Sequence, residues 1–146
     1  DAAHLRMGKL LEENKDLPVD VKGQTVFYVG PAPAKPGCVI GPAGPTSSYR
    51  MDRYTPRLLD AGLKGMIGKG DRSKEVKEAI LRNRAVYFAA VGGAAALLSK
   101  HITACELVAY EDLGTEAIYR MQLEDFPVIV AFDSFGNNLY EGYQRQ

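Results

Sequence analysis

The middle of the chain alternates short apolar runs with helical segments, and this alternation limits the possible folds more than any other feature of the sequence. Residues 65–67 and 85–91 are apolar runs, and each ends at a glycine turn. The first turn leads into residues 73–83, whose apolar positions recur at helical spacing, and the second leads into an alanine-rich helical segment that ends at about residue 100. Strands that alternate with helices are typical of α/β folds. The sequence therefore predicts an α/β fold.

Further elements are expected on the N-terminal side of this region and directly after it. Apolar residues at positions 3, 7, 10 and 11, behind Asp1 as a helix cap, predict an N-terminal helix over residues 1–15. The other predicted elements are a strand at 25–29, a short strand at 38–40 inside the Pro- and Gly-rich loop 30–45, a helix at 50–61 and a strand at 105–110.

The C-terminal part has a different pattern. Residues 117–123, 128–132 and 139–143 are three extended runs, and the last two are joined by a turn-forming segment. We expect these runs to form a small β-meander. Because no linker divides the chain into two cores, residues 1–146 are predicted to be one domain.

Charge and cysteine content exclude several classes of function. Eighteen basic and eighteen acidic residues leave no net charge, which argues against nucleic acid as a partner. The apolar run around residues 94–98 is far shorter than the roughly 20 residues that span a bilayer, so no membrane segment is expected. Cys38 and Cys105 have no other ligand residues at metal-binding spacing, which predicts free thiols in a reducing compartment. Asp1 is not an initiator methionine, so we expect the true start to lie upstream.

Two cations occupy positions from which they could hold an anion. Arg50 follows a turn, and Lys69 lies between two glycines where a strand gives way to a helix, a place where ligand sites of α/β proteins collect. A solvated turn lysine is the more common explanation of this feature taken alone, and the full phosphate-loop pattern is absent around it. A ligand with two carboxylates would need two such cations to bind both of its charged groups.

Other polar residues have ordinary structural explanations. Thr46, Ser47 and Ser48 form a hydroxyl cluster that could cap the following helix, and no activating neighbour stands beside Thr46 in the sequence. His4 lies on the first helix and His101 at the end of another. The acidic pairs at 111–112 and 124–125 are expected to be solvated loop charges.

Several segments together resemble one enzyme family. Residues 44–52, G-P-T-S-S-Y-R-M-D, resemble the G-P-T-T-x-x-R-M-D loop of class I fumarases and L-tartrate dehydratases. The likeness continues through 62–73, 92–95, 116–118 and 123–127, and so covers nearly the whole chain. In this family, one part of the enzyme carries a [4Fe-4S] cluster, and the part that this chain resembles surrounds the substrate.

The resemblance implies a fold, a reaction and a set of residue roles. The fold would be a swivelling β/β/α three-layer domain, and the chain would be a β subunit for reversible hydration of fumarate to L-malate. Thr46 would abstract a proton, assisted by an acid from the partner, while Ser47, Arg50 and Lys69 would bind the dicarboxylate. The cluster would belong to an α subunit and not to this chain, in a cytoplasmic hetero-oligomer with two copies of each subunit.

The match departs from the family in three places, which leaves alternatives open. Ser47 replaces a second threonine, the pair 48–49 replaces small residues, and a family arginine would fall just before Asp1. An L-tartrate dehydratase β subunit is therefore one alternative. A non-catalytic anion-binding module without its partner is another.

Overall fold

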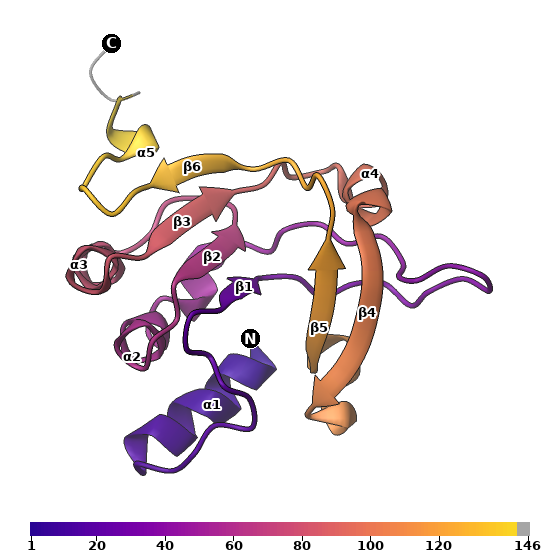
Figure 1. The fold of residues 1–146 in the computed structure, drawn as a ribbon, viewed down its shortest axis with the longest axis horizontal. Coiled ribbons are helices and arrows are strands. Elements are labelled where there is room, and N and C mark those ends of the chain that lie inside the picture. Colours follow the sequence, from indigo (N-terminus) through magenta and orange to yellow (C-terminus); the bar gives the residue numbers. More distant parts are fainter. Residues whose placement is uncertain (143–146) are drawn as a thin grey trace.

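The computed structural model describes residues 1–142, which form helices and strands in two separate sheets (Figure 1). The α-helices are α1 (Ala2–Glu12), α2 (Thr55–Asp60), α3 (Lys74–Asn83), α4 (Ala95–Leu98) and α5 (Leu139–Gly142). The strands are β1 (Thr25–Phe27), β2 (Gly65–Gly68), β3 (Val86–Ala89), β4 (Ile102–Ala109), β5 (Ile118–Leu123) and β6 (Ile129–Phe132). Three 3-10 helices are η1 (Ser48–Met51), η2 (Ser99–His101) and η3 (Glu111–Glu116).

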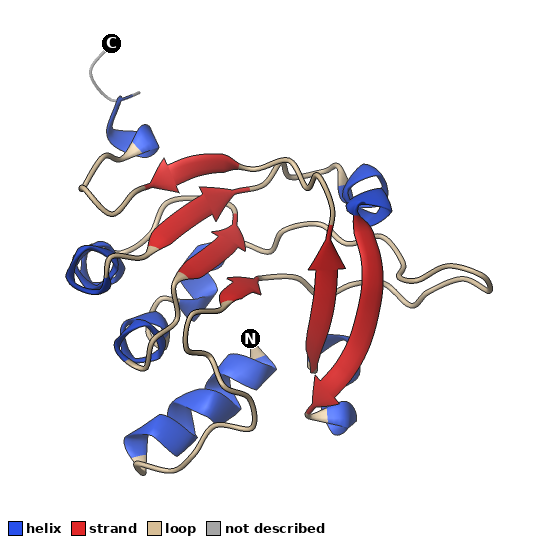
Figure 2. Cartoon of the chain, viewed as in Figure 1, coloured by secondary structure: helices blue, strands red, loops and turns tan. Residues whose placement is uncertain are grey.

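The larger sheet has the strand order β1-β2-β3-β6. Strands β1, β2 and β3 are parallel, and β6 runs antiparallel to β3 at the edge. Within the described residues, strands β4 and β5 pair with each other alone, as an antiparallel ribbon that stands apart from the main sheet (Figure 2). Mixed α/β architecture is thereby confirmed.

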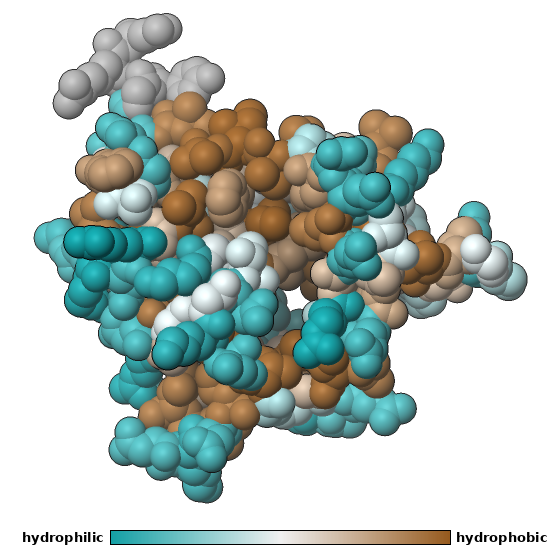
Figure 3. Space-filling view, in the orientation of Figure 1, coloured by the Kyte–Doolittle hydropathy of each residue, from teal (hydrophilic) through white to brown (hydrophobic). Residues whose placement is uncertain are grey.

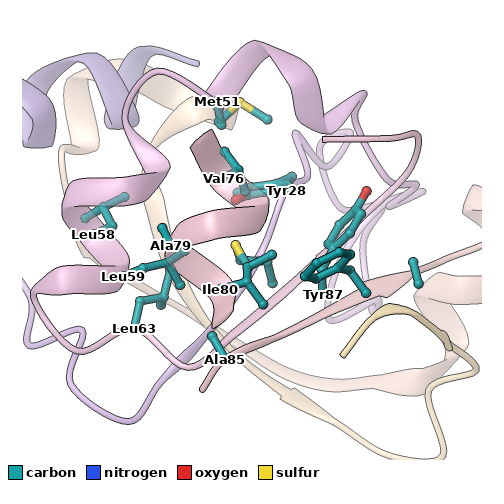
Figure 4. Close-up of a cluster of buried hydrophobic side chains, with 13 residues drawn as sticks. Tyr28, Met51, Leu58, Leu59, Leu63, Val76, Ala79, Ile80, Ala85 and Tyr87 are labelled. Carbon is teal, nitrogen blue, oxygen red and sulfur yellow. The ribbon is translucent and has the colours of Figure 1, made fainter. Parts of the chain in front are cut away.

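The main core lies where α2 and α3 pack on the larger sheet. Helix α3 begins at Ser73, whose Oγ accepts a hydrogen bond of 3.3 Å from the Val76 N–H, and it buries the apolar face that the sequence pattern predicts. Strand β2 is buried along its whole length, as expected for a central parallel strand. The core cluster, drawn in Figure 4, consists of Tyr28, Met51, Leu58, Leu59, Leu63, Met66, Val76, Ala79, Ile80, Ala85, Tyr87, Ala131 and Phe132.

One charged side chain lies inside this core. The side chain of Arg72 is 1% exposed, and its Nε donates to Asp52 Oδ1 at 2.7 Å. Its Nη2 donates to Tyr28 Oη at 3.1 Å and to Thr55 Oγ1 at 3.0 Å. The guanidinium carbon also lies 5.1 Å and 4.8 Å from the ring centroids of Tyr28 and Tyr87. The buried charge is thus paired, hydrogen-bonded and flanked by aromatic rings.

The predicted C-terminal β-meander is wrong. Strand β5 pairs with β4, and β6 pairs with β3, so the two strands belong to different sheets. Residues 139–142 form α5 rather than a strand, because the Asn138 side chain accepts the Tyr140 N–H at 3.0 Å and starts a helical turn. Tyr143, the last residue of that predicted run, lies outside the described residues.

Two smaller expectations also change. Residues 38–40 form an irregular loop rather than a strand, and Val39 is 52% exposed. The helix predicted at 50–61 is divided into η1 and α2, with Pro56 in the first turn of α2, where it removes no helical hydrogen bond. Among residues 1–142, no helix combines the length and apolarity needed to cross a bilayer.

We expect Asp52→Ala to lower the free energy of unfolding by about 3–5 kcal/mol, because it leaves the buried Arg72 charge without its partner. Asp60→Ala is the matched control: Asp60 Oδ1 lies 2.9 Å from Arg82 Nη2 with both side chains about half exposed, and its loss should cost about 1 kcal/mol or less. Urea unfolding of both variants measures the difference. Equal losses of unfolding free energy in the two variants would show that the buried Arg72–Asp52 pair matters no more to stability than an exposed ion pair.

Candidate functional site

The loop between β1 and η1 adds its backbone to the carboxyl ends of the parallel strands. The Thr46 N–H donates to the Tyr28 carbonyl oxygen at 2.7 Å, and the Ser48 N–H donates to the Lys69 carbonyl oxygen at 3.0 Å. Ser47 pairs with Lys69 as an isolated parallel bridge. The hydroxyl cluster and Lys69, more than twenty positions apart in the sequence, are therefore neighbours in the backbone.

The Ser48 side chain fastens this loop to the turn that carries Lys69. Ser48 is fully buried, and its Oγ accepts the Lys69 N–H at 3.1 Å and lies 2.8 Å from Tyr87 Oη. Tyr87 Oη also lies 2.7 Å from the Gly70 carbonyl oxygen. The phenol is the donor in both contacts, so its single hydrogen is shared between Ser48 Oγ and the Gly70 carbonyl oxygen. The two side chains thus hold both ends of the Lys69-Gly70 segment.

Two further features support this arrangement. Burial raises the pKa of Tyr87 well above its ordinary value, so the phenol keeps the hydrogen that it donates. A Cβ at Gly68 would lie 2.0 Å from Ser48 Oγ, so only glycine allows Ser48 to approach the end of β2 this closely. Gly68 is therefore required for contact between the loop and the strand.

Thr46 and Arg50 lie in the wall of a large open cavity. This cavity has a volume of about 1140 Å³ and is bounded by α1, β1, the loop before η1 and the inner side of the β4–β5 ribbon. Figure 3 shows the molecule hollowed at this place. Arg50 is half exposed, and its Nη1 lies 3.5 Å from Asp1 Oδ2. A cation that is this accessible can exchange its partner for a ligand carboxylate.

Ser47 and Lys69 do not belong to the lining of this cavity. Both are partly exposed, and the Lys69 side chain runs from the end of β2 toward Gly92. The structure therefore brings the four predicted site residues together as two adjoining pairs, with Thr46 and Arg50 in the cavity wall and Ser47 and Lys69 beside it.

His4 is a cavity residue whose surroundings the sequence pattern does not reveal. It is 7% exposed, and its ring lies 5.5 Å from the Tyr28 ring and 6.3 Å from the Tyr54 ring between centroids. Its Nε2 is buried without a hydrogen-bond partner. Burial, reinforced by the charge of Arg72, lowers the pKa of His4 to about 4. The imidazole is therefore neutral at pH 7. The sequence gives one indication that His4 is buried, because it lies on the same helix face as the apolar residues Ala3 and Met7.

The remaining polar candidates have structural partners or remain apart. Arg6 Nη1 donates to Asp112 Oδ1 at 2.8 Å, and this pairing lowers the pKa of the Asp112 carboxyl. Cys38 is exposed, while partial burial raises the pKa of the Cys105 thiol. Within residues 1–142, no group of three or more His, Cys, Asp or Glu side chains is placed to hold a metal ion.

Comparison with known proteins connects this geometry to one family. The family model described as "Fumarase C-terminus" matches residues 1–143. Two relatives in Escherichia coli, the anaerobic and aerobic class I fumarate hydratases, are 37% and 35% identical over 97% and 99% of this chain. The chain spans about a quarter of the length of these two relatives, 26% and 27%.

A shorter relative has a different name. A protein of Methanocaldococcus jannaschii, whose name assigns it as an L(+)-tartrate dehydratase subunit beta, is 34% identical over the full chain, and the match covers 78% of that protein. The alignment therefore covers most of the length of this relative, which is named as a subunit.

The buried imidazole predicts a specific pH dependence. Below a pH of about 6.5, the unfolded chain binds a proton at His4 that the folded chain excludes until the pH falls to about 4, so stability is lost as the pH falls through this window. The loss should reach roughly 3 kcal/mol. Urea unfolding between pH 7 and pH 4 measures it. His4→Phe keeps a ring against Tyr28 and should show a smaller loss over the same window, and identical slopes would contradict the assignment.

Proposed function

This chain belongs to the fumarase C-terminus family, and on that premise we propose that it is the substrate-binding β subunit of an iron-sulfur-dependent hydro-lyase that interconverts fumarate and L-malate. The observation that carries the proposal is the backbone junction of the Thr46–Arg50 loop with Lys69, which places hydroxyls and cations at the same end of the sheet. The proposal also takes residues 1–146 as one domain of the swivelling β/β/α type.

Arg50 and Lys69 hold the two substrate carboxylates. A guanidinium can grip a carboxylate through two hydrogen bonds, whereas an ammonium acts as a point charge. Hydrogen bonds to charged groups contribute about 1.5–3 kcal/mol each, so two cations contribute both affinity and orientation. Ser47 pairs with Lys69 through the backbone bridge, and its hydroxyl adds one hydrogen bond to the carboxylate held there.

Thr46 abstracts the proton beside the carboxylate when malate loses water. Removal of this proton builds negative charge, which the neighbouring cations stabilise. A threonine Oγ1 is a weak base, so an ionised carboxylate of the partner has to accept the hydrogen of this hydroxyl as Oγ1 takes up the substrate proton. The partly exposed position of Thr46 in the cavity wall leaves its side chain open to such a group.

The cluster belongs to the partner in this proposal. A [4Fe-4S] cluster is held by cysteine thiolates, and the two cysteines here lie on a loop and on β4 with no further ligands grouped around them in residues 1–142. These residues do not fit the group. We therefore assign the cluster to an α subunit, in a cytoplasmic hetero-oligomer with two copies of each subunit.

A second candidate is the β subunit of an L(+)-tartrate dehydratase. The relative from Methanocaldococcus jannaschii favours it, because the match takes in all of this chain and 78% of that protein. Ser47 also has one methyl group less than threonine, which leaves more room beside Lys69.

Steady-state turnover by the complex tests the proposal. The chain is purified together with its cluster-bearing partner under argon, and rates are measured with fumarate, L-malate and L-tartrate. We expect hydration of fumarate and dehydration of L-malate. Exclusive turnover of L-tartrate would establish the second candidate. If a complex with an intact cluster binds dicarboxylates but does not turn them over, the chain is an anion-binding module.

Replacing either cation should harm catalysis far more than folding. We expect Arg50→Ala and Lys69→Ala each to lower kcat/KM at least tenfold, because each removes a charge-assisted contact with substrate. The melting temperature should stay close to that of the parent complex, since both residues are partly or fully exposed. Arg53→Ala, which removes an exposed arginine three positions along, is the matched control. If both variants lost stability and activity to the same extent, Arg50 and Lys69 would have a structural role and not a substrate-binding one.

The hydroxyl of Thr46 has a separate test. Thr46→Ser keeps an oxygen in place and should retain more turnover than Thr46→Val, which keeps the shape and removes the oxygen. The kcat of the reconstituted complex at saturating L-malate measures this order. The reverse order would remove Thr46 from the proton transfer.

A further inference from the structure

The backbone of Lys69 is fixed on both sides. Its N–H is bound by Ser48 Oγ, its carbonyl oxygen accepts the Ser48 N–H, and the next carbonyl, of Gly70, accepts from Tyr87. The Cα–Cβ direction of Lys69 is therefore determined by buried groups. The position of the ammonium then depends on what lies along the rest of the side chain.

Gly92 lies beside the outer half of that side chain. A Cβ placed on Gly92 would be 3.5 Å from Lys69 Cδ and 3.8 Å from Lys69 Nζ. A single carbon at this position would make ordinary van der Waals contact, whereas a branched side chain would extend into the space that the ammonium occupies. The bare backbone of Gly92 thus forms the surface along which Lys69 lies.

The backbone conformation does not require glycine at this position. Gly93, the next residue, has a φ of 80°, which L-residues rarely adopt, but Gly92 is not among the positive-φ residues of the chain. Gly92 is also exposed, so a larger side chain there would displace no core group. What glycine provides at position 92 is space next to Lys69.

We propose that Gly92 is a positioning residue for substrate binding, because its missing side chain determines where the Lys69 ammonium lies. This inference rests on the proposed function, in which Lys69 binds a substrate carboxylate. A bulky residue at position 92 pushes the ammonium off the strand-end surface toward solvent and weakens its hold on the dicarboxylate. Affinity then falls while the hydroxyl of Thr46 and the folded structure remain as they are.

The test compares Gly92→Ala and Gly92→Val in the reconstituted complex with fumarate as substrate. We expect KM to rise less than threefold for Gly92→Ala and about tenfold for Gly92→Val, with kcat changed less than KM in each case. Ala96→Val adds the same kind of bulk at an exposed position four residues further on and should leave KM unchanged. In a Lys69→Ala background, Gly92→Val should have no further effect on KM, because the group through which it acts is gone.

A chemical measurement separates this inference from the proposed function. Acetylation of Lys69 by an N-hydroxysuccinimide ester, followed by mass spectrometry, reports how accessible the ammonium is, whether or not the complex turns over fumarate. We expect Gly92→Val to increase this rate and Ala96→Val to leave it unchanged. An unchanged rate in Gly92→Val would overturn the positioning role of Gly92. An increased rate with unchanged KM would instead overturn the substrate-binding role of Lys69.

Discussion

A buried ion pair between Arg72 and Asp52 connects the hydrophobic core to the candidate site. Asp52 follows directly after η1, and Arg72 follows the turn that carries Lys69, so this pair joins the two segments that supply the candidate site residues. The second Asp52 oxygen accepts the Ser73 N–H at 2.8 Å at the start of α3. Because the Arg72 charge is buried, the surrounding aromatic and hydroxyl groups must be in place before it can be accommodated. The core and the site are therefore formed together.

This framework explains why the site combines rigid and accessible groups. Ser48, Tyr87 and Gly68 fasten the backbone of the site loop to β2, and all three are buried. Arg50 and Lys69 project from this fixed backbone with side chains that solvent can reach. Because this backbone is already fixed, binding of an anion has to order only the side chain of each cation. In the proposed function, this arrangement binds a small diacid from one side, and a partner covers the opposite side.

Local sequence pattern predicted those parts of the fold that depend on neighbouring residues. The buried face of α3 and the glycine turn around Lys69 both follow from spacing or from the backbone preference of one residue. The pairing of β5 and β6 with different strands could not be predicted, because the residues of an extended run do not indicate which strand it will pair with. The helical turn at 139–142 was also missed, since it depends on the side chain of Asn138.

The same division holds for the candidate site. Thr46, Ser47, Arg50 and Lys69 could be selected because their residue types and their motif are visible in the sequence. Arg72 could not, since its contacts join positions up to 44 residues apart and a buried arginine looks like a surface one in the sequence. The unpartnered nitrogen of His4 and the space at Gly92 are likewise properties of packing.

In the proposed enzyme, this chain supplies cations and a hydroxyl, while a partner supplies the iron. The decisive experiment measures fumarate hydration under argon for the metal-free chain alone and for the reconstituted complex. We expect no turnover by the chain alone and full turnover by the complex. Hydration of fumarate by the metal-free chain at the rate of the complex would mean that the chain needs neither the partner nor its iron.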